Sequence, residues 1–146
     1  MEIAKDFEEF FASLNAHKVR YLIVGGYAFA IHARPRFTDD LDVLVDAKKE
    51  NAQRILEALN DFGFGSVGLT VDDLTKDDNV IQLGYSPLRI DILTSVSNVA
   101  FDDAWKRKVE GSFGEQKVFF ISKQDLILSK TGTGRPRDEQ DLKDLQ

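Results

Sequence analysis

The chain has 146 residues, 42% of them hydrophobic, and its 25 acidic and 19 basic residues give a formal net charge of −6. This acidic balance excludes a protein that coats nucleic acid through bulk electrostatics, so any such contact must be local. The absence of cysteine excludes disulfides and thiolate metal sites and is expected of a cytoplasmic protein. The longest apolar stretch, Tyr21–Ile31, is shorter than the ~20 residues that cross a bilayer. We therefore expect one soluble, unprocessed domain over residues 1–146, without a membrane partner.

The apolar pattern switches between helical and strand spacing along the chain. In chain order it predicts helix 4–16, strand 19–24, helix 27–33, strand 41–46, helix 49–63, strands 79–85 and 88–94, helix 100–109, strand 117–121, helix 122–131 and a last short helix from near residue 138. Gly25 and Gly26 stop the first strand, Pro35 ends the second helix, and Gly63 is expected to cap the third. A turn at residues 86–87 would join two strands into a hairpin. This order predicts a mixed sheet with flanking helices, an α/β (α+β) fold.

The second predicted strand begins among carboxylates, those of Asp39, Asp40 and Asp42. Because side chains alternate along a strand, Asp40 and Asp42 point to the same face, with Cβ atoms ~6.5–7 Å apart. A cation would relieve their repulsion. The acidic pair precedes the apolar run, an order that is wrong for a haloacid-type phosphatase, and the glycine and glutamate of an EF-hand loop are absent. A metal site and a solvated strand entrance remain as the two interpretations.

A further carboxylate, Asp91, lies inside an otherwise apolar strand. An unpaired carboxylate is costly to bury, so Asp91 needs a partner. If its strand lies beside the second one, Asp91 joins Asp40 and Asp42 in an all-oxygen site suited to Mg²⁺ or Mn²⁺. The alternative is an ion pair with Arg89, which shares its strand face.

The glycine pair has two interpretations as well. Gly25 and Gly26 end a strand and open a helix, so backbone N–H groups at the helix N-terminus could hold phosphate oxygens. A tight turn that requires positive φ is the commoner explanation of such a pair.

The motifs "GGYAFAIHARPRFTDDLDVLV" and "RIDIL" together resemble the nucleotidyltransferase domain of the DNA polymerase beta superfamily. In that superfamily two glycines or Gly-Ser open a helix, Arg-x-Thr-x-Asp-x-Asp follows on a strand, and a third Asp lies on a neighbouring strand. From Val19 onward the chain also resembles small stand-alone members, including the nucleotidyltransferase toxins of abortive-infection toxin-antitoxin pairs. The resemblance implies a polymerase-beta-type nucleotidyltransferase fold.

The resemblance also implies roles for individual residues. Asp40, Asp42 and Asp91 would be the catalytic residues and the ligands of Mg²⁺ or Mn²⁺, with Asp91 also taking the proton of the attacking hydroxyl. The nucleotide-binding residues would be Gly25, Gly26, Arg36, Thr38 and Lys130.

Several of these residues also have an alternative interpretation. Arg36 could equally be an ion-pair partner of Asp39 or Asp40. The family's basic and acidic cluster corresponds to Arg135, Arg137, Asp138 and Asp141, whose alternative is a helix cap with surface ion pairs. Asp125 and Lys130 match the pattern Asp-x-x-x-x-Lys of the toxin-like members, and His32 is expected to be a packing residue at a helix end.

The implied reaction moves a nucleoside monophosphate from a nucleoside triphosphate to an acceptor hydroxyl and releases pyrophosphate. Gly26 stands where the family often has Ser, and Ala33 where it often has Gly, but neither departure removes a metal ligand. The chain has no room for the recognition domains of larger members. The acceptor, a small molecule, a protein side chain or an RNA end, is therefore left open, and a homo-oligomer or a partner protein could complete its site. The alternative function is a non-catalytic module that binds a nucleotide or a partner in a toxin-antitoxin-like pair.

Overall fold

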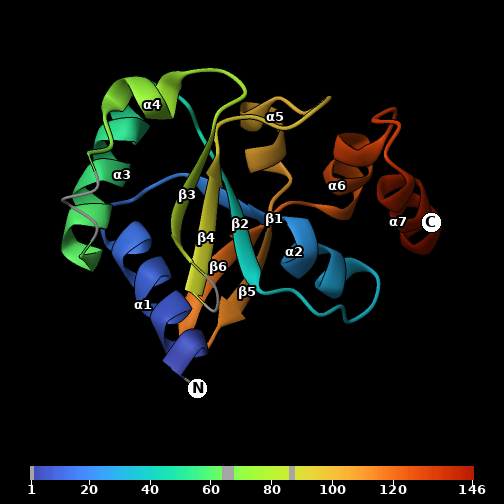
Figure 1. Ribbon diagram of the computed structural model, residues 1–146, viewed down its shortest axis with the longest axis horizontal. Coiled ribbons are helices and arrows are strands. Elements are labelled where there is room, and N and C mark those ends of the chain that lie inside the picture. The colour runs from blue at the N-terminus through green and yellow to red at the C-terminus, as the bar shows by residue number, and fades with distance from the viewer. Residues whose placement is uncertain (1, 64–67, 86–87) are drawn as a thin grey trace.

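Figure 1 shows the computed structural model of the chain, which describes residues 2–63, 68–85 and 88–146. Over these ranges the chain forms seven helices and six strands. The helices are α1 (Glu2–Ala16), α2 (Gly25–His32), α3 (Lys49–Phe62), α4 (Val71–Thr75), α5 (Phe101–Lys106), α6 (Lys123–Lys130) and α7 (Pro136–Leu145). The strands are β1 (Tyr21–Val24), β2 (Asp40–Val45), β3 (Val80–Tyr85), β4 (Leu88–Leu93), β5 (Val109–Phe113) and β6 (Gln116–Phe120). Among the described residues, no helix combines the length and the apolar character needed to cross a membrane.

The strands form one six-stranded sheet in the order β3-β4-β2-β1-β6-β5. β2 pairs in parallel with β4, and β1 with β6, whereas the pairs β1–β2, β3–β4 and β5–β6 are antiparallel. The predicted mixed sheet is therefore confirmed, as is the antiparallel pairing of β3 with β4. The turn predicted at residues 86–87 lies outside the described residues.

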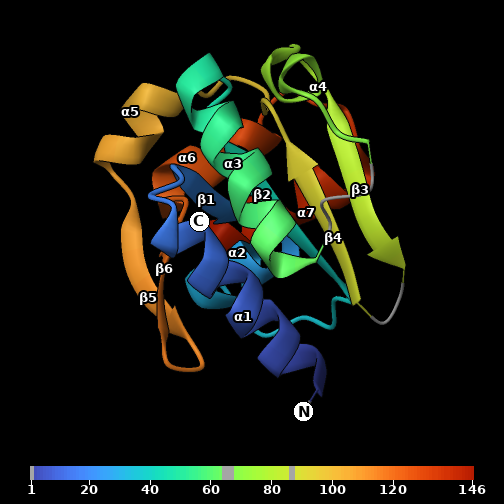
Figure 2. The ribbon, with the colours of Figure 1, turned by 90° about the vertical axis from the view of Figure 1, so that its left-hand side faces the viewer.

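Helices cover both faces of the sheet. Figures 1 and 2 show α1 and α3 on one face and α2, α6 and α7 on the other. α1 buries Phe7, Phe10, Phe11 and Leu14, each at most 2% exposed, because residues spaced three, four and seven apart share one side of a helix. The ring of Phe10 packs edge-on against Phe62 of α3, with centroids 5.5 Å apart. The aromatic side of α1 thus closes the core on that face.

β2 has an apolar face and an acidic face. Leu41, Val43 and Val45 are at most 1% exposed and belong to the core, whereas Asp40 and Asp42 occupy the alternate positions. Alternation therefore turns the two carboxylates to the side of the sheet that carries α6 and α7. The acidic residues at the start of the strand do not enter the hydrophobic core.

Two segments depart from the predicted elements. The helix expected over residues 100–109 is wrong at its end, because α5 stops at Lys106 and Val109 begins β5. β5 is a largely exposed edge strand, so it lacks the apolar alternation that marks a half-buried strand. A turn at Gly114, with φ of 61°, pairs it with β6. The short helix α4 is also absent from the prediction, and a capping box between Thr70 and Asp73 begins it.

Candidate active site

Three carboxylates come together because β2 and β4 are parallel neighbours. The pairing sets Asp42 opposite Asp91, and Asp40 opposite Arg89. One carboxylate oxygen from each of Asp40, Asp42 and Asp91 lies within 4.8 Å of the other two. The structure thus brings together the three aspartates that the sequence singled out, from two strands that are far apart in the chain.

Asp91 also has a cation beside it. Arg89 donates from Nε to Asp91 Oδ1 at 3.1 Å and from Nη2 to Oδ2 at 3.0 Å. Both interpretations of Asp91, the carboxylate cluster and the ion pair, are therefore present at once. Asp91 is 6% exposed, so Arg89 compensates a buried carboxylate that lies beside two like charges.

Asp42 has no ion-pair partner within the described part of the chain. Burial, followed by repulsion from Asp40 and Asp91, raises the pKa of Asp42 from 3.8 to about 7, although Arg89 and Lys130 attract its negative charge. The charged form of this carboxylate is disfavoured by its surroundings. A cation bound between the carboxylates would stabilise it.

The donor set of the cluster fits a divalent metal ion. All the available ligand atoms are carboxylate oxygens, which suit Mg²⁺ and Mn²⁺. Thr38 Oγ1 lies 3.1 Å from the carbonyl oxygen of Asp40 and 3.3 Å from its Oδ1, and donates its hydrogen to these acceptors. Thr38 therefore orients one carboxylate of the cluster.

Gly25 and Gly26 lie where β1 meets α2, beside the carboxylates. Val24 pairs with Asp42 across the β1–β2 ladder, so the next residue passes close to the Asp42 side chain. Gly25 has φ of 68°, and a Cβ there would overlap Asp42 Oδ2, while a Cβ at Gly26 would lie 3.0 Å from that of Thr38. No side chain caps α2 and its first turn has no acidic residue, so its first N–H groups can receive an anion.

We expect Gly25→Ala to weaken metal binding, because the added methyl group pushes the Asp42 carboxylate out of place. Gly63→Ala is the matched control, since Gly63 also has positive φ, 106°, yet a Cβ there meets no atom of the described residues within 4 Å. Both variants carry a left-handed backbone cost of about 1–2 kcal/mol, which thermal unfolding measures. Only Gly25→Ala should lower the affinity for Mn²⁺ in a calorimetric titration. Equal Mn²⁺ affinities of the two variants would contradict the close approach of Gly25 to Asp42.

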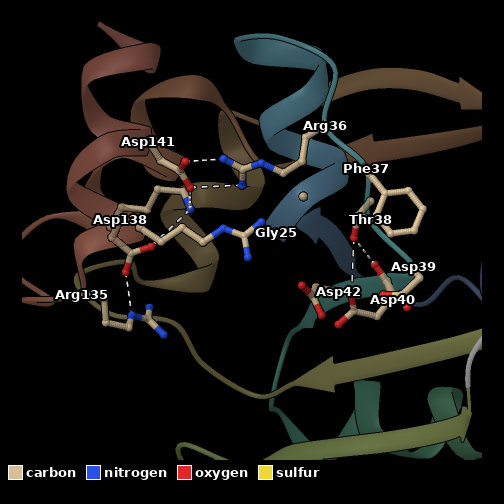
Figure 3. A pocket seen from close by; sticks show the side chains of 13 residues that line it. Gly25, Arg36, Phe37, Thr38, Asp39, Asp40, Asp42, Arg135, Asp138 and Asp141 are labelled. Carbon is tan, nitrogen blue, oxygen red and sulfur yellow. Dashed lines mark hydrogen bonds and ion pairs between the residues drawn. The ribbon is translucent and has the colours of Figure 1, made fainter.

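A cleft of about 530 Å³ opens beside these groups, bounded by the start of α2, the loop before β2, and helices α6 and α7. Figure 3 shows Asp40 and Asp42 on one side of it and Arg36, directed at α7, on the other. Its lining includes every predicted nucleotide-binding residue, namely Gly25, Gly26, Arg36, Thr38 and Lys130. Arg135 and Arg137 add further positive charge. We call this space the cationic cleft after its four basic side chains; its lining also holds Asp39, Asp40, Asp42, Asp138 and Asp141.

Buried carboxylates of α7 hold two cations of the cationic cleft. Arg36 forms a two-pronged ion pair with Asp141 and stacks on Phe29, with Cζ 3.7 Å from the ring centroid. Lys130 donates from Nζ to Asp141 at 2.9 Å and to Asp138 at 3.5 Å. Arg36 thus pairs with Asp141 of α7, a partner that the sequence analysis did not assign to it.

Asp138 and Asp141 are 6% and 1% exposed, so the surface location considered for their ion pairs is wrong. Burial raises the pKa of Asp141, but hydrogen bonds from Arg36 and Lys130 bring it below its ordinary value overall. The spacing of Asp138, Asp141 and Leu145 places these three buried residues on one side of α7. This helical spacing is the feature of the sequence that could have indicated the burial of the two aspartates.

Two other residues of the sequence analysis have structural contacts. Asp125 is fully buried and receives hydrogen bonds from Arg107, at 3.0 and 2.8 Å, and from Ser122, at 3.0 Å. It belongs to the start of α6 rather than to the lining of the cationic cleft. His32 Nε2 lies 2.7 Å from the carbonyl oxygen of Ile121, as expected of a packing residue at a helix end.

The mixed sheet thus sets three carboxylates beside a glycine-opened helix and the cationic cleft. The chain belongs to the family described as "Nucleotidyltransferase of unknown function (DUF6036)", whose sequence profile matches residues 1–146. The resemblance found in the sequence motifs is thereby confirmed. No curated protein matches the chain significantly in sequence.

Solved structures share the fold. The lincosamide antibiotic adenylyltransferase LnuA, in its lincomycin-bound form, has a TM-score of 0.60 and 19% identity, over 97% of this chain and 94% of that one. A putative nucleotidyltransferase from Thermotoga maritima has a TM-score of 0.64 and 16% identity, over 97% and 91%. An antigenic nucleotidyltransferase-like protein from Paracoccidioides brasiliensis has a TM-score of 0.53 and 15% identity, over 99% and 74%. These similarities confirm the predicted nucleotidyltransferase fold.

Proposed function

We propose that the protein is a Mg²⁺-dependent nucleotidyltransferase, which moves a nucleoside monophosphate from a nucleoside triphosphate to an acceptor hydroxyl and releases pyrophosphate. The observation that carries this proposal is the cluster of Asp40, Asp42 and Asp91, with oxygens within 4.8 Å, at the border of the cationic cleft. Nucleotidyl transfer needs a metal site and a polyphosphate site next to each other. The family and the structural neighbours support the same general class.

The polyphosphate would bind in the cationic cleft. Gly25 and Gly26 leave space for phosphate oxygens to approach the N-terminus of α2, whose N–H groups and dipole favour an anion. Arg36 and Lys130 would contact the β- and γ-phosphates. Their side chains are 13% and 12% exposed, so an ion pair with phosphate would form where water screens it little.

The reaction would take place at the α-phosphorus, beside the carboxylates. Bound Mg²⁺ supplies charge neutralisation at the attacking and leaving oxygens. Asp40 and Asp42 would hold the positive charge of Mg²⁺ in place, and Thr38 orients the Asp40 carboxylate. The acceptor oxygen forms a bond to the α-phosphorus while the bond from this phosphorus to the oxygen that bridges to the β-phosphate breaks. The electron pair of that bond leaves with pyrophosphate, and the hydroxyl proton passes to Asp91.

Transfer can be tested with nucleoside triphosphates labelled at the α-phosphate. The protein is incubated with each of them, Mg²⁺, and RNA, protein or small-molecule acceptors. We expect the label to appear in one class of acceptor together with an equal amount of pyrophosphate, and EDTA to stop both. Release of inorganic phosphate as the first product, or transfer that continues in EDTA, would contradict the proposal.

The alternative function is a non-catalytic module that binds a nucleotide or a partner. Arg89 favours this alternative, because its hydrogen bonds to both oxygens of Asp91 already give that carboxylate a cation. Such a module would bind a triphosphate equally well with Mg²⁺ and with EDTA, and would leave it intact. Recovery of unchanged nucleotide together with metal-independent affinity would support the module over the enzyme.

Lys130→Met should weaken the binding of a triphosphate more than that of a monophosphate, because Lys130 lies where the outer phosphates are expected. The triphosphate dissociation constant should rise about tenfold or more, since a hydrogen bond to a charged group contributes roughly 1.5–3 kcal/mol. Lys143→Met is the control, because it removes the same charge from an exposed position on α7. Equal losses for monophosphate and triphosphate would make Lys130 a structural partner of Asp141.

The cellular setting and the assembly of the protein stay predictions. We expect a cytoplasmic protein with one domain over residues 1–146, which acts alone, as a homo-oligomer or with a partner protein in a toxin-antitoxin-like pair. Size-exclusion chromatography with light scattering measures the oligomeric state of the purified protein.

A further inference from the structure

A second hollow, of about 380 Å³, adjoins the cationic cleft at Asp42. Both spaces are lined by Gly25, Asp42 and Lys130. The cationic cleft reaches Thr38, before β2 begins, whereas the second hollow reaches Leu93, whose register partner Leu44 lies beyond Asp42 along β2. The two spaces also share Arg135 and Asp138, and they extend from Asp42 toward opposite ends of β2.

The walls of the second hollow combine apolar and hydroxyl groups. Val80 and Leu93 come from the paired strands β3 and β4, and Ser95, Ser97 and Ser129 add hydroxyls. A volume of about 380 Å³ lies within the range of ~300–1,000 Å³ that is typical of small-molecule sites, as does a lining that places a few polar groups among apolar ones.

The second hollow is built from segments that are tied to one another. Asn98 donates from Nδ2 to the carbonyl oxygens of Leu128 and Thr131, both at 3.0 Å, which fastens the chain after β4 to the end of α6. Thr94 Oγ1 donates to the carbonyl oxygen of Lys76 at 2.6 Å, which holds the chain before β3. These contacts keep the walls in place without a ligand, as expected of a preformed site.

Asp78 is a carboxylate of the second hollow, whose lining also holds Asp42, Asp138, Lys130 and Arg135. Ser95 Oγ donates to Asp78 Oδ1 at 2.7 Å, and no ion pair joins Asp78 to a cation within residues 2–63, 68–85 and 88–146. Of the two other carboxylates of the lining, Asp138 pairs with Lys130 and Arg135, and Asp42 belongs to the carboxylate cluster. An exposed carboxylate that lines a hollow and lacks a cation is suited to a positively charged ligand.

The geometry points to the second hollow as the acceptor site, and we infer that the acceptor is a small molecule that carries both a hydroxyl and a protonated amine. This inference rests on the proposed function. In an in-line displacement the attacking oxygen and the leaving oxygen lie on opposite sides of the phosphorus. With pyrophosphate in the cationic cleft, the attacking hydroxyl comes from the direction of the second hollow, which meets the carboxylate cluster at Asp42. Asp78 then receives the amine.

The same features disfavour the macromolecular acceptors. The phosphates of an RNA end would approach the negative charge of Asp78, which repels them. Among the described residues that line the second hollow, the cations are Lys130 and Arg135, and both also line the cationic cleft. A side chain of a folded protein would have to reach between α6 and the edge strand β3, past Val80. An RNA or protein acceptor is thus the competing outcome of the test below.

The test divides one cell extract into a small-molecule filtrate, RNA and protein, and offers each fraction to the enzyme with α-labelled triphosphate and Mg²⁺. We expect the label to enter the small-molecule filtrate alone. Acetylating the amines of that filtrate beforehand should abolish the labelling, because a neutral amide no longer pairs with Asp78. Label in RNA or protein, or unchanged labelling of the acetylated filtrate, overturns the inference.

Two variants test whether the acceptor binds in the second hollow. Val80→Trp fills it from an edge-strand position that is 59% exposed, and Val109→Trp makes the same change on the opposite edge strand, at a valine that is 38% exposed. Val80→Trp should reduce transfer about tenfold or more, because a displaced acceptor loses its attack geometry, and should leave triphosphate binding within about twofold. Val109→Trp should change neither. Equal transfer by the two variants, or a loss of triphosphate affinity in Val80→Trp, overturns the assignment.

Asp78→Asn tests the charge, with Asp77→Asn as its control. Asp78 has φ of 55°, a conformation that Asn tolerates well, so the variant should fold. Asp78→Asn should lower transfer to the small-molecule filtrate about tenfold, which matches the free energy that a hydrogen bond to a charged group usually contributes. Asp77→Asn should leave transfer unchanged. Equal transfer by Asp78→Asn and Asp77→Asn would overturn the inference that the acceptor amine pairs with Asp78. If triphosphate binds and no fraction is labelled, the proposed transfer itself fails, and this inference fails with it.

Discussion

Asp42→Asn is expected to abolish nucleotidyl transfer while the protein stays folded. Asp42 lies in both spaces and at the centre of the carboxylate cluster, and the variant removes the charge that would hold the metal. Loss of several kcal/mol of charge stabilisation would slow transfer by about a thousandfold or more, since ~1.4 kcal/mol corresponds to a factor of ten. Turnover of α-labelled triphosphate measures the effect. A variant with wild-type turnover would remove Asp42 from the reaction.

The same substitution should stabilise the metal-free protein, and more so at pH 8 than at pH 5. The pKa of Asp42 is raised from 3.8 to about 7, so the native state keeps a proton that the unfolded chain has already released. The stability linked to this proton is fully present below pH 3.8 and is lost as the pH rises through about 7. Asn resembles the protonated form at every pH.

Thermal unfolding in EDTA at pH 5 and pH 8 measures this difference between wild type and Asp42→Asn. The variant should melt higher than wild type at both pH values and by more at pH 8, because the unfolded wild type releases its proton above pH 3.8 while the native state keeps it up to about pH 7. Asp77→Asn is the control for removing an exposed carboxylate. A gain that is the same at both pH values, or a large loss of stability, would contradict the raised pKa and its cause.

The second large effect concerns the affinity for Mn²⁺, which is expected to fall sharply in Asp40→Asn and in Asp91→Asn. Each removed charge weakens the attraction to the same ion. Asp91→Asn also frees Arg89 from its ion pair, so a positive charge then lies near the remaining carboxylates. We expect each single variant to lose about tenfold or more in affinity, as ligands with one shared ion do.

The double variant of Asp40 and Asp91 should lose less than the sum of the single losses, because one missing ligand already leaves the site incomplete. Calorimetric titration with Mn²⁺ measures all four proteins without knowledge of the acceptor. Additive losses would mean separate sites. If Asp91→Asn kept the wild-type affinity, the third carboxylate would be only the ion-pair partner of Arg89, and the non-catalytic module would be favoured.

The acidic face of β2 could be predicted because alternation along a strand is a local property. Asp40 and Asp42 share a face whatever the strand packs against. Asp91 could be placed beside them only on the condition that its strand is the neighbour of β2, because strand order depends on the whole chain. The conformation of Gly25 was likewise considered from its position between a strand and a helix, whereas its approach to Asp42 depends on the β1–β2 register.

The contacts of the cationic cleft could not be predicted because they join distant parts of the chain. Arg36 and Asp141 are 105 residues apart, and they meet only because α7 packs on the same face of the sheet as α2. The second hollow has the same origin, since its walls come from β3, β4 and α6. β5 escaped prediction for a different reason, because a short exposed strand with a glycine and a serine carries little apolar pattern.

The parallel pairing of β2 with β4 has a consequence for how the protein would acquire the proposed metal ion. The chain passes through α3, α4 and β3 before Asp91 can reach Asp42, and such non-local pairing is slow to form. A chain in which β4 has not yet docked has only part of the cluster, so the ion is a ligand of the finished fold and stabilises it by mass action. An ion that binds only after this pairing slows unfolding without speeding folding. If the proposed ion binds, its supply therefore sets how long each folded molecule persists, while the metal-free chain alone determines how fast the protein folds.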